Sequence, residues 1–138
     1  MASGWTIVNN KGLPVRQYEP FFTRTHRFGA AAAIGVSPIV CYDPAGRAVA
    51  TVNPDHTWAK VAFDAWRQES WDACDTVLIA DPRTDPDVGD HLARLSAADT
   101  LPTWYAARAS GGLGPDQQAA LTDLWIVLTW GTTARTAT

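Results

Sequence analysis

Tyr42-Asp43-Pro44-Ala45-Gly46-Arg47 is the stretch that decides the predicted fold. Asp43 can cap neighbouring backbone groups, Pro44 restricts backbone rotation, and Gly46 can adopt a positive φ. A tight turn needs these three properties within a few residues. The stretch therefore predicts a turn, which an apolar, β-prone segment at 36–41 enters from the N-terminal side.

The sequence after this turn predicts a β-hairpin. Residues 47–53 alternate around Val49 and Thr51 as a strand does, and Asn53-Pro54-Asp55-His56 is a second group of turn formers. The segment that follows predicts the partner strand. It ends at Phe63-Asp64, which repeats the aromatic–Asp step of the first turn, so that a new unit begins there.

Further strands are predicted on both sides of this unit. Residues 5–8 form a β-prone run that ends at the turn-forming Asn9-Asn10-Lys11-Gly12, and 66–71 alternates as the start of the next hairpin. Within the aromatic segment 15–22, Tyr18-Glu19-Pro20 is a looser version of the Tyr-Asp-Pro step. Together with the two later aromatic–Asp steps, it gives a period of about two dozen residues, as in a small repeated unit.

The chain after residue 80 changes from strand-like to helical patterns. Asp85-Pro86-Asp87 predicts a helix start with an N-cap, a proline and a first-turn acid, and an apolar stripe from Val88 to Leu95 follows. Residues 101–108 predict a second short helix, and Gly114-Pro115-Asp116 opens a third. Because helices follow strands rather than alternating with them, the predicted fold is α+β, with antiparallel hairpins followed by short C-terminal helices.

Length and composition limit the organisation and the partners of the chain. We divide it into a β-rich segment, 1–80, and a short helical segment, 81–138, which ends in an atypical apolar tail. The net charge of −3 is scattered, so we expect neither a nucleic-acid partner nor a polybasic membrane patch. The first ten residues lack the pattern of a secretory signal, and no apolar run reaches the ~20 residues of a membrane-spanning helix.

Cys41 and Cys74 are the only cysteines in the sequence. Their spacing fits neither a zinc site nor a thioredoxin-type motif. A disulfide would form only if the fold brought them together. We favour two free thiols, buried as small hydrophobic side chains.

No cofactor site, metal site or catalytic site is predicted. The densest acidic cluster comprises Asp81, Asp85, Asp87 and Asp90. Its spacing is not that of an EF-hand, and turn formation and helix capping explain its members better than a metal does. Cys41 with His56 and Asp43 is the most plausible nucleophilic combination, yet no local motif accompanies it. Glu69 and Asp72 are a nominal carboxylate pair whose separation is not defined by sequence. We therefore expect no enzyme activity.

Three tryptophans, Trp58, Trp66 and Trp71, are the residues on which a binding function would depend. All three lie in predicted strand runs, where packing across the sheet explains them better than exposure. If they were exposed instead, their rings could stack on a glycan or contact a protein partner. A carbohydrate- or partner-binding module is therefore the alternative function.

Arg47 and Arg67 follow corresponding aromatic–Asp steps. We expect them to pair with Asp43 and Asp64 rather than to bind phosphate. Surface pairs of this kind contribute only ~0–1 kcal/mol to stability.

The unit from Tyr42 to Asp64 resembles one YD repeat of the Rhs/YD-repeat proteins. The blocks on either side are similar, in the same order, to the late part of the B component of insecticidal Tc toxin complexes and its SpvB/TcaC-like relatives. These blocks are Lys11-Gly12-Leu13-Pro14-Val15-Arg16-Gln17-Tyr18-Glu19-Pro20-Phe21-Phe22, Gly35-Val36-Ser37-Pro38, Trp66-Arg67-Gln68-Glu69, Asp75-Thr76-Val77-Leu78 and Asp81-Pro82-Arg83-Thr84-Asp85-Pro86-Asp87-Val88-Gly89-Asp90. The similarity covers roughly 5–120. Beyond it, the apolar run 124–130 and a Thr/Ala-rich tail replace the expected next repeat.

The resemblance implies a structural role. In this family, YD-repeat hairpins join edge to edge into a hollow shell, which together with the C component encloses a cytotoxic region before translocation. The chain would then be a fragment of a secreted shell, exported without a local signal, with neighbouring YD-repeat segments and the C component as its partners. The residues that would shape the hairpin are Tyr42, Asp43, Gly46, Arg47, Pro54, Asp55, Phe63 and Asp64.

Overall fold

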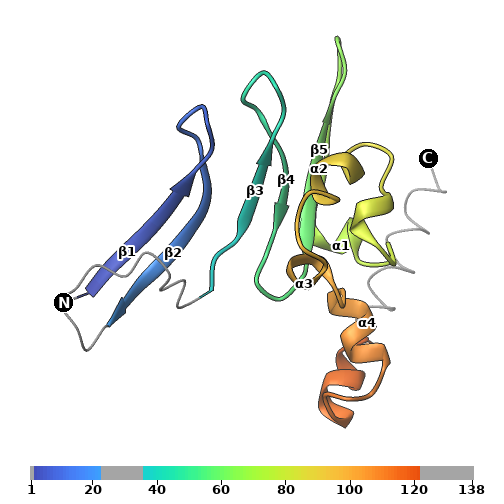
Figure 1. Ribbon diagram of the computed structural model, residues 1–138. Coiled ribbons are helices and arrows are strands. Elements are labelled where there is room, and N and C mark those ends of the chain that lie inside the picture. Colours follow the sequence, from blue (N-terminus) through green and yellow to red (C-terminus); the bar gives the residue numbers. More distant parts are fainter. Residues whose placement is uncertain (1, 23–35, 122–138) are drawn as a thin grey trace.

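The computed structural model describes residues 2–22 and 36–121, with side chains described for 5–18 and 36–121. A six-stranded antiparallel sheet runs through most of this length, in the order β1-β2-β3-β4-β5-β6 (Figure 1). The strands are β1 (Ala2–Val8), β2 (Pro14–Phe22), β3 (Ile39–Tyr42), β4 (Ala48–Val52), β5 (Trp58–Phe63) and β6 (Gln68–Trp71). Each strand pairs with the strand that follows it in the chain, so the sheet is a continuous meander. The predicted antiparallel hairpins are confirmed.

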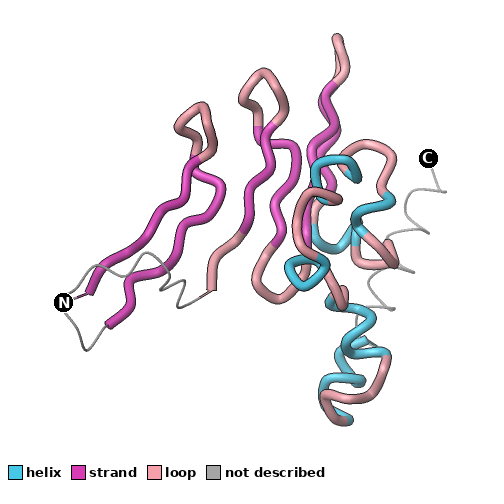
Figure 2. Tube along the Cα trace, in the orientation of Figure 1, coloured by secondary structure: helices cyan, strands magenta, loops and turns pink. Residues whose placement is uncertain are grey.

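Short helices follow the sheet and gather near β5 (Figures 1 and 2). They are α1 (Ala73–Thr76), the 3-10 helix η1 (Pro82–Thr84), α2 (Gly89–Leu92), α3 (Ala97–Thr100) and α4 (Trp104–Ala109). Residues 115–121, the last described, are also helical. The fold is therefore α+β. None of the helices within the described residues has the length and apolar character that crossing a membrane requires.

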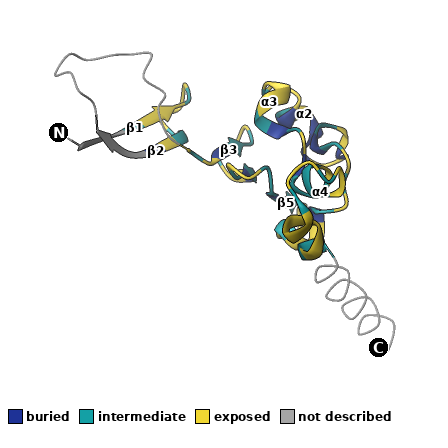
Figure 3. Cartoon of the chain, turned by 90° about the horizontal axis from the view of Figure 1, so that it is seen from below, coloured by how far each residue is buried: buried dark blue, intermediate teal, exposed yellow. Residues whose placement is uncertain are grey.

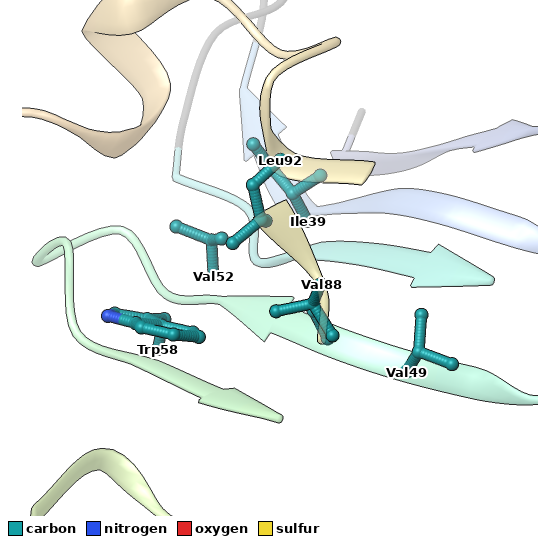
Figure 4. Packing of buried hydrophobic residues seen from close by; sticks show 7 residues of the cluster. Ile39, Val49, Val52, Trp58, Val88 and Leu92 are labelled. Carbon is teal, nitrogen blue, oxygen red and sulfur yellow. The ribbon is translucent and has the colours of Figure 1, made fainter. Parts of the chain in front are cut away.

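One core joins the sheet to the helical region (Figure 4). Its buried members are Ile39, Val49, Ala50, Val52 and Trp58 from the strands, and Val88 and Leu92 from α2 and its N-cap. Leu92 is fully buried, and Val88 and Trp58 are 1% and 2% exposed. The β-rich segment before residue 80 and the helical segment after it thus bury their apolar side chains against each other.

A β-bulge in β4 changes the expected alternation of its side chains. Cys41 pairs with Ala50, and Tyr42 pairs with Ala48, so Val49 has no opposite residue. A bulge of this kind lets two successive residues lie on the same face. Val49 and Ala50 are accordingly both buried, whereas the alternation had predicted Val49 on the face of Thr51.

The β1–β2 hairpin is the least covered part of the sheet (Figure 3). In the strand register it is opposed to β3 at a single pair of residues, Arg16 and Ile39. Among residues 5–18 of this hairpin, the Tyr18 side chain is buried, whereas Ile7 and Val8 are 41% and 53% exposed. The prediction that Tyr18-Glu19-Pro20 repeats the turn step is wrong, because these residues lie inside β2.

The helices differ from their predicted limits. Asp85 is the C-cap of η1 rather than the N-cap of a helix, and α2 begins only at Gly89. The second predicted helix begins at Trp104, where the Thr103 hydroxyl accepts a hydrogen bond from the Ala106 N–H. Helix α3 was not predicted. The apolar run 124–130 lies outside the described residues.

Candidate functional site

The turn at Asp43–Arg47 is the best-defined feature of the sequence motif. The Asp43 N–H donates to the Arg47 carbonyl at 2.9 Å, and the Gly46 N–H donates to the Asp43 carbonyl at 2.9 Å. The Asp43 carboxylate also accepts from the Arg47 N–H at 2.9 Å. Gly46 has a φ of +85°, which glycine adopts without steric cost. This geometry is the three-residue hairpin loop that ends in a left-handed residue.

Two further hairpins use the same turn. At Asn9–Leu13, Asn9 and Leu13 are joined by an N–H to carbonyl bond of 2.9 Å, and Gly12 has a φ of +77°. At Asn53–Thr57 the corresponding bond is 2.8 Å, and His56 has a φ of +64°. In each case the N–H of the left-handed residue donates to the carbonyl of the first residue. The repeated element is therefore an Asx residue followed three positions later by a left-handed residue.

Carboxylate caps hold two of these turns. Asp55 accepts from the Thr57 N–H at 3.0 Å and from the Thr57 hydroxyl at 2.6 Å. Burial alone would raise the pKa of Asp55, but the hydrogen bonds from Thr57 outweigh it, so the pKa lies below its usual value. The hydrogen bond from the Arg47 backbone is the main reason why the pKa of Asp43 is lowered. Both turns are thus stabilised by ionised carboxylates at neutral pH.

The corner at Tyr42–Arg47 also contacts the hairpins before and after it. The Tyr42 hydroxyl donates to the Pro14 carbonyl of β2 at 2.8 Å. The Lys11 amine donates to the Pro44 carbonyl. The Arg47 guanidinium, 2.7 Å from the Asp43 carboxylate as predicted, lies over the Phe63 ring at the end of β5. Motif residues therefore join three successive hairpins.

The turn at Phe63-Asp64 is built differently. The Asp64 N–H donates to the Arg67 carbonyl at 2.8 Å, closing a shorter turn. The Asp64 carboxylate accepts from the Ala65 N–H, and Arg67 pairs with Glu69 at 2.9 Å. The predicted pairing of Arg67 with Asp64 is wrong because the shorter turn sends the Arg67 side chain along β6.

The three candidate binding tryptophans lie in different surroundings. Trp58 is 2% exposed, so it cannot stack on a ligand, and it is corrected from a binding residue to a core residue. Trp66 is 96% exposed in the β5–β6 turn, contrary to the expectation that it packs across the sheet. Trp71 is 39% exposed, opposite Lys60. Only Trp66 and Trp71 remain available to a partner.

Lys60 forms a buried charge cluster that sequence reasoning missed. Its amine lies 2.8 Å from the Asp85 carboxylate and 2.7 Å from the Asp87 carboxylate. Asp85 is therefore a partner of Lys60 besides capping the backbone N–H groups of Asp87 and Val88. Alternation in β5 offered a signal, since it places Lys60 on the face of the core residue Trp58.

The other candidate sites are not assembled. Cys41 lies beside the Asp43 turn at one end of β4, while His56 lies in the turn at the opposite end, where its ring is 2.6 Å from the Pro102 carbonyl. Cys74 is exposed, against the expectation of a buried thiol, and both cysteines are free. Within 2–22 and 36–121, no group of three or more His, Cys, Asp or Glu side chains is placed to hold a metal.

Comparison with known proteins adds no identification. No family model matches the chain, and no curated protein is significantly similar to it in sequence. The Tc toxin resemblance therefore rests on the residue blocks alone, and what it implies for function is a proposal.

Proposed function

We propose that the chain is a wall segment of a Tc-type toxin shell, in which YD-repeat hairpins join edge to edge around a cytotoxic cargo. The observation that carries this proposal is the corner at Tyr42–Arg47, which contacts the preceding hairpin through Tyr42 and the following strand through Arg47. A corner that contacts both neighbours suits a wall built by adding hairpins in succession. The role is architectural, and no enzymatic turnover is expected.

The strand order supports the same proposal. In a meander, a new hairpin can be added at either outer strand without rethreading the chain. β1 and β6 are the outer strands of the described sheet, and an outer strand presents backbone groups that another strand can pair with. Neighbouring YD-repeat segments would supply such strands.

Co-expression with the C component of a Tc complex tests the proposal. We expect the chain to co-purify with the C component and to protect its cytotoxic region from added protease. Arg47→Ala should weaken both effects. Arg67→Ala is the matched control, because Arg67 is exposed and pairs with Glu69 on the surface. Failure of the wild-type chain to co-purify or protect would refute the shell function.

A partner- or glycan-binding module is the second candidate, and it is favoured by the exposure of Trp66. An indole that is 96% exposed at the end of a hairpin is available for stacking. If this function holds, Trp66→Ala abolishes binding on a glycan array while circular dichroism remains unchanged. Leu113→Ala is the control, since Leu113 is another exposed apolar side chain, 55% accessible. Absence of glycan binding by the wild type would eliminate the glycan version.

A further inference from the structure

The buried cluster around Lys60 brings an amine and a carboxyl group into contact. The Lys60 Nζ lies 3.0 Å from Oδ1 and 2.8 Å from Oδ2 of Asp85, and 2.7 Å from Oδ2 of Asp87. The Lys60 and Asp85 side chains are 4% and 3% exposed, whereas that of Asp87 is 44% exposed. The Trp71 ring covers the amine, with its centroid 4.7 Å from Nζ. The amine and the Asp85 carboxyl are thus largely withdrawn from water.

We propose that Lys60 and Asp85 form an intramolecular isopeptide bond, with Asp87 transferring the protons. Amines and carboxylic acids do not condense readily in dilute aqueous solution. Groups held in contact by a fold, however, react as if at effective concentrations of about 10⁵–10⁸ M. Because Nζ is within hydrogen-bonding distance of both Asp85 oxygens, the carboxyl carbon between them is the electrophile next to the amine.

The backbone around Asp85 is suited to stabilise the reaction intermediate. Oδ1 of Asp85 accepts from the Asp87 N–H at 2.9 Å and from the Val88 N–H at 3.2 Å. Two such donors stabilise the negative charge that develops on this oxygen when the nitrogen adds to the carboxyl carbon. In the product they would bind the amide carbonyl, and Asp87 would accept from the amide N–H. Every polar group of the new bond would then have a partner.

The proton balance assigns Asp87 its role. Burial alone would lower the pKa of Lys60, but the hydrogen bonds it donates to Asp85 and Asp87 outweigh this and raise the pKa, so the amine starts protonated. Asp87 first takes a proton from Nζ and passes it to Oδ2 of Asp85, which frees the lone pair of the amine and makes the Asp85 carboxyl group neutral before the nitrogen adds. The nitrogen then forms a bond to the Asp85 carbon, and Oδ2 leaves as water.

The two protons of that water both begin on Nζ, and Asp87 relays them and ends as a carboxylate. One ammonium and one carboxylate become one amide and one water, with no change in net charge and no oxidant. The bond would close residues 60–85 into a covalent loop that contains β6 and α1. Unlike a disulfide, this bond is insensitive to reducing agents.

Mass spectrometry of the denatured full-length chain tests the proposal. After correction for the substitution, the wild type should be lighter than Lys60→Arg by one water, because arginine preserves the charge but cannot form the amide. Trypsin should release a branched peptide joining 48–67 to 84–94, since acylated Lys60 is not cleaved. Asp87→Asn should slow formation of this peptide by about 100-fold or more.

The outcomes separate the possibilities. Circular dichroism first establishes that each variant retains the fold. A folded wild-type chain with the unmodified mass overturns the proposal and shows that the cluster is an ion pair only. Formation of the branched peptide at an equal rate in Asp87→Asn overturns the proton-transfer role of Asp87.

Discussion

The guanidinium carbon of Arg47 lies 4.2 Å from the centroid of the Phe63 ring. The same guanidinium is 2.7 Å from the Asp43 carboxylate. One side chain therefore joins the corner of one hairpin to the aromatic residue that opens the next. At an exposed position, a cation over an aromatic face stabilises by about 0.5–1 kcal/mol.

Replacing Arg47 by Ala should lower the free energy of unfolding by about 1 kcal/mol, because the contact with Phe63 is lost. Urea denaturation measures this change. Arg67→Ala, which removes a surface partner of Glu69, should stay within about 0.5 kcal/mol of the wild type. Equal losses in the two variants would contradict the assigned contribution of the Phe63 contact.

Gly46→Ala should destabilise the protein by about 1–2 kcal/mol through backbone strain. An added Cβ would lie 3.5 Å from Leu13, an ordinary contact, so steric overlap is not the cause. Gly46→Asn should cost less, because asparagine tolerates a positive φ better. Gly112→Ala is the control, since Gly112 lacks a positive φ and has room for a Cβ. Thermal unfolding distinguishes these variants, and equal costs for the Ala and Asn variants at position 46 would contradict the strain argument.

Lys60→Met should lower the free energy of unfolding by about 3–5 kcal/mol, because methionine forms neither an amide nor an ion pair with Asp85, whose carboxylate is then buried without a cation. Adding Asp85→Asn should restore part of this loss, since the amide is neutral and its oxygen can still accept from the Val88 N–H. Urea denaturation of the single and double variants checks both expectations. A double variant less stable than Lys60→Met would show that the unpaired charge is not the cause.

The ion pair between Arg16 of β2 and Asp99 of α3, 2.9 Å long, should make stability depend on acid pH. Burial alone would raise the pKa of Asp99, but hydrogen bonds from Arg16 and Ser96 outweigh it and lower the pKa below its ordinary 3.8. The stabilisation is therefore present above pH 3.8 and is lost as pH falls through the lowered value.

Melting temperatures measured from neutral pH down to below the folded pKa test this dependence. Arg16→Gln should lose less stability than the wild type over the acid interval. Arg67→Gln should follow the wild-type curve. Parallel curves for the wild type and Arg16→Gln would show that this pair does not contribute to the acid dependence.

Amide hydrogen exchange should be faster in β1 and β2 than in β4 and β5. The buried core includes β4 and β5 residues, whereas the β1–β2 hairpin joins the sheet through the Arg16–Ile39 pair. Segments with few buried apolar contacts open at lower free energy. Equal protection across all strands would contradict this expectation.

The hairpin corners were predictable from sequence because their determinants are local. Asp43 and Gly46 lie within one turn, so the residues that require the turn are adjacent in the chain. The left-handed conformation of His56 was harder to predict from the sequence, since a histidine in a turn does not indicate a positive φ as a glycine does.

The charge cluster was not predictable because its determinants are distant. Asp85 and Asp87 match a helix start by local rules, and Lys60, 25 and 27 residues away, redirects them toward the sheet. The bulge at Val49 was missed for a related reason. The alternation of side chains is a property of a single strand, whereas a bulge depends on the register between two paired strands.

A pulling force between Ala2 and Trp71 would act across the strands and separate them one pair at a time. Successive strands are neighbours in the chain, and these two residues lie on the two outer strands, at the same end of the meander. The hydrogen bonds between paired strands would therefore break one after another, instead of sharing the load in shear. The junction at Arg16 and Ile39 would yield early, so the first hairpin could be peeled away while the strands beneath α2 stayed folded.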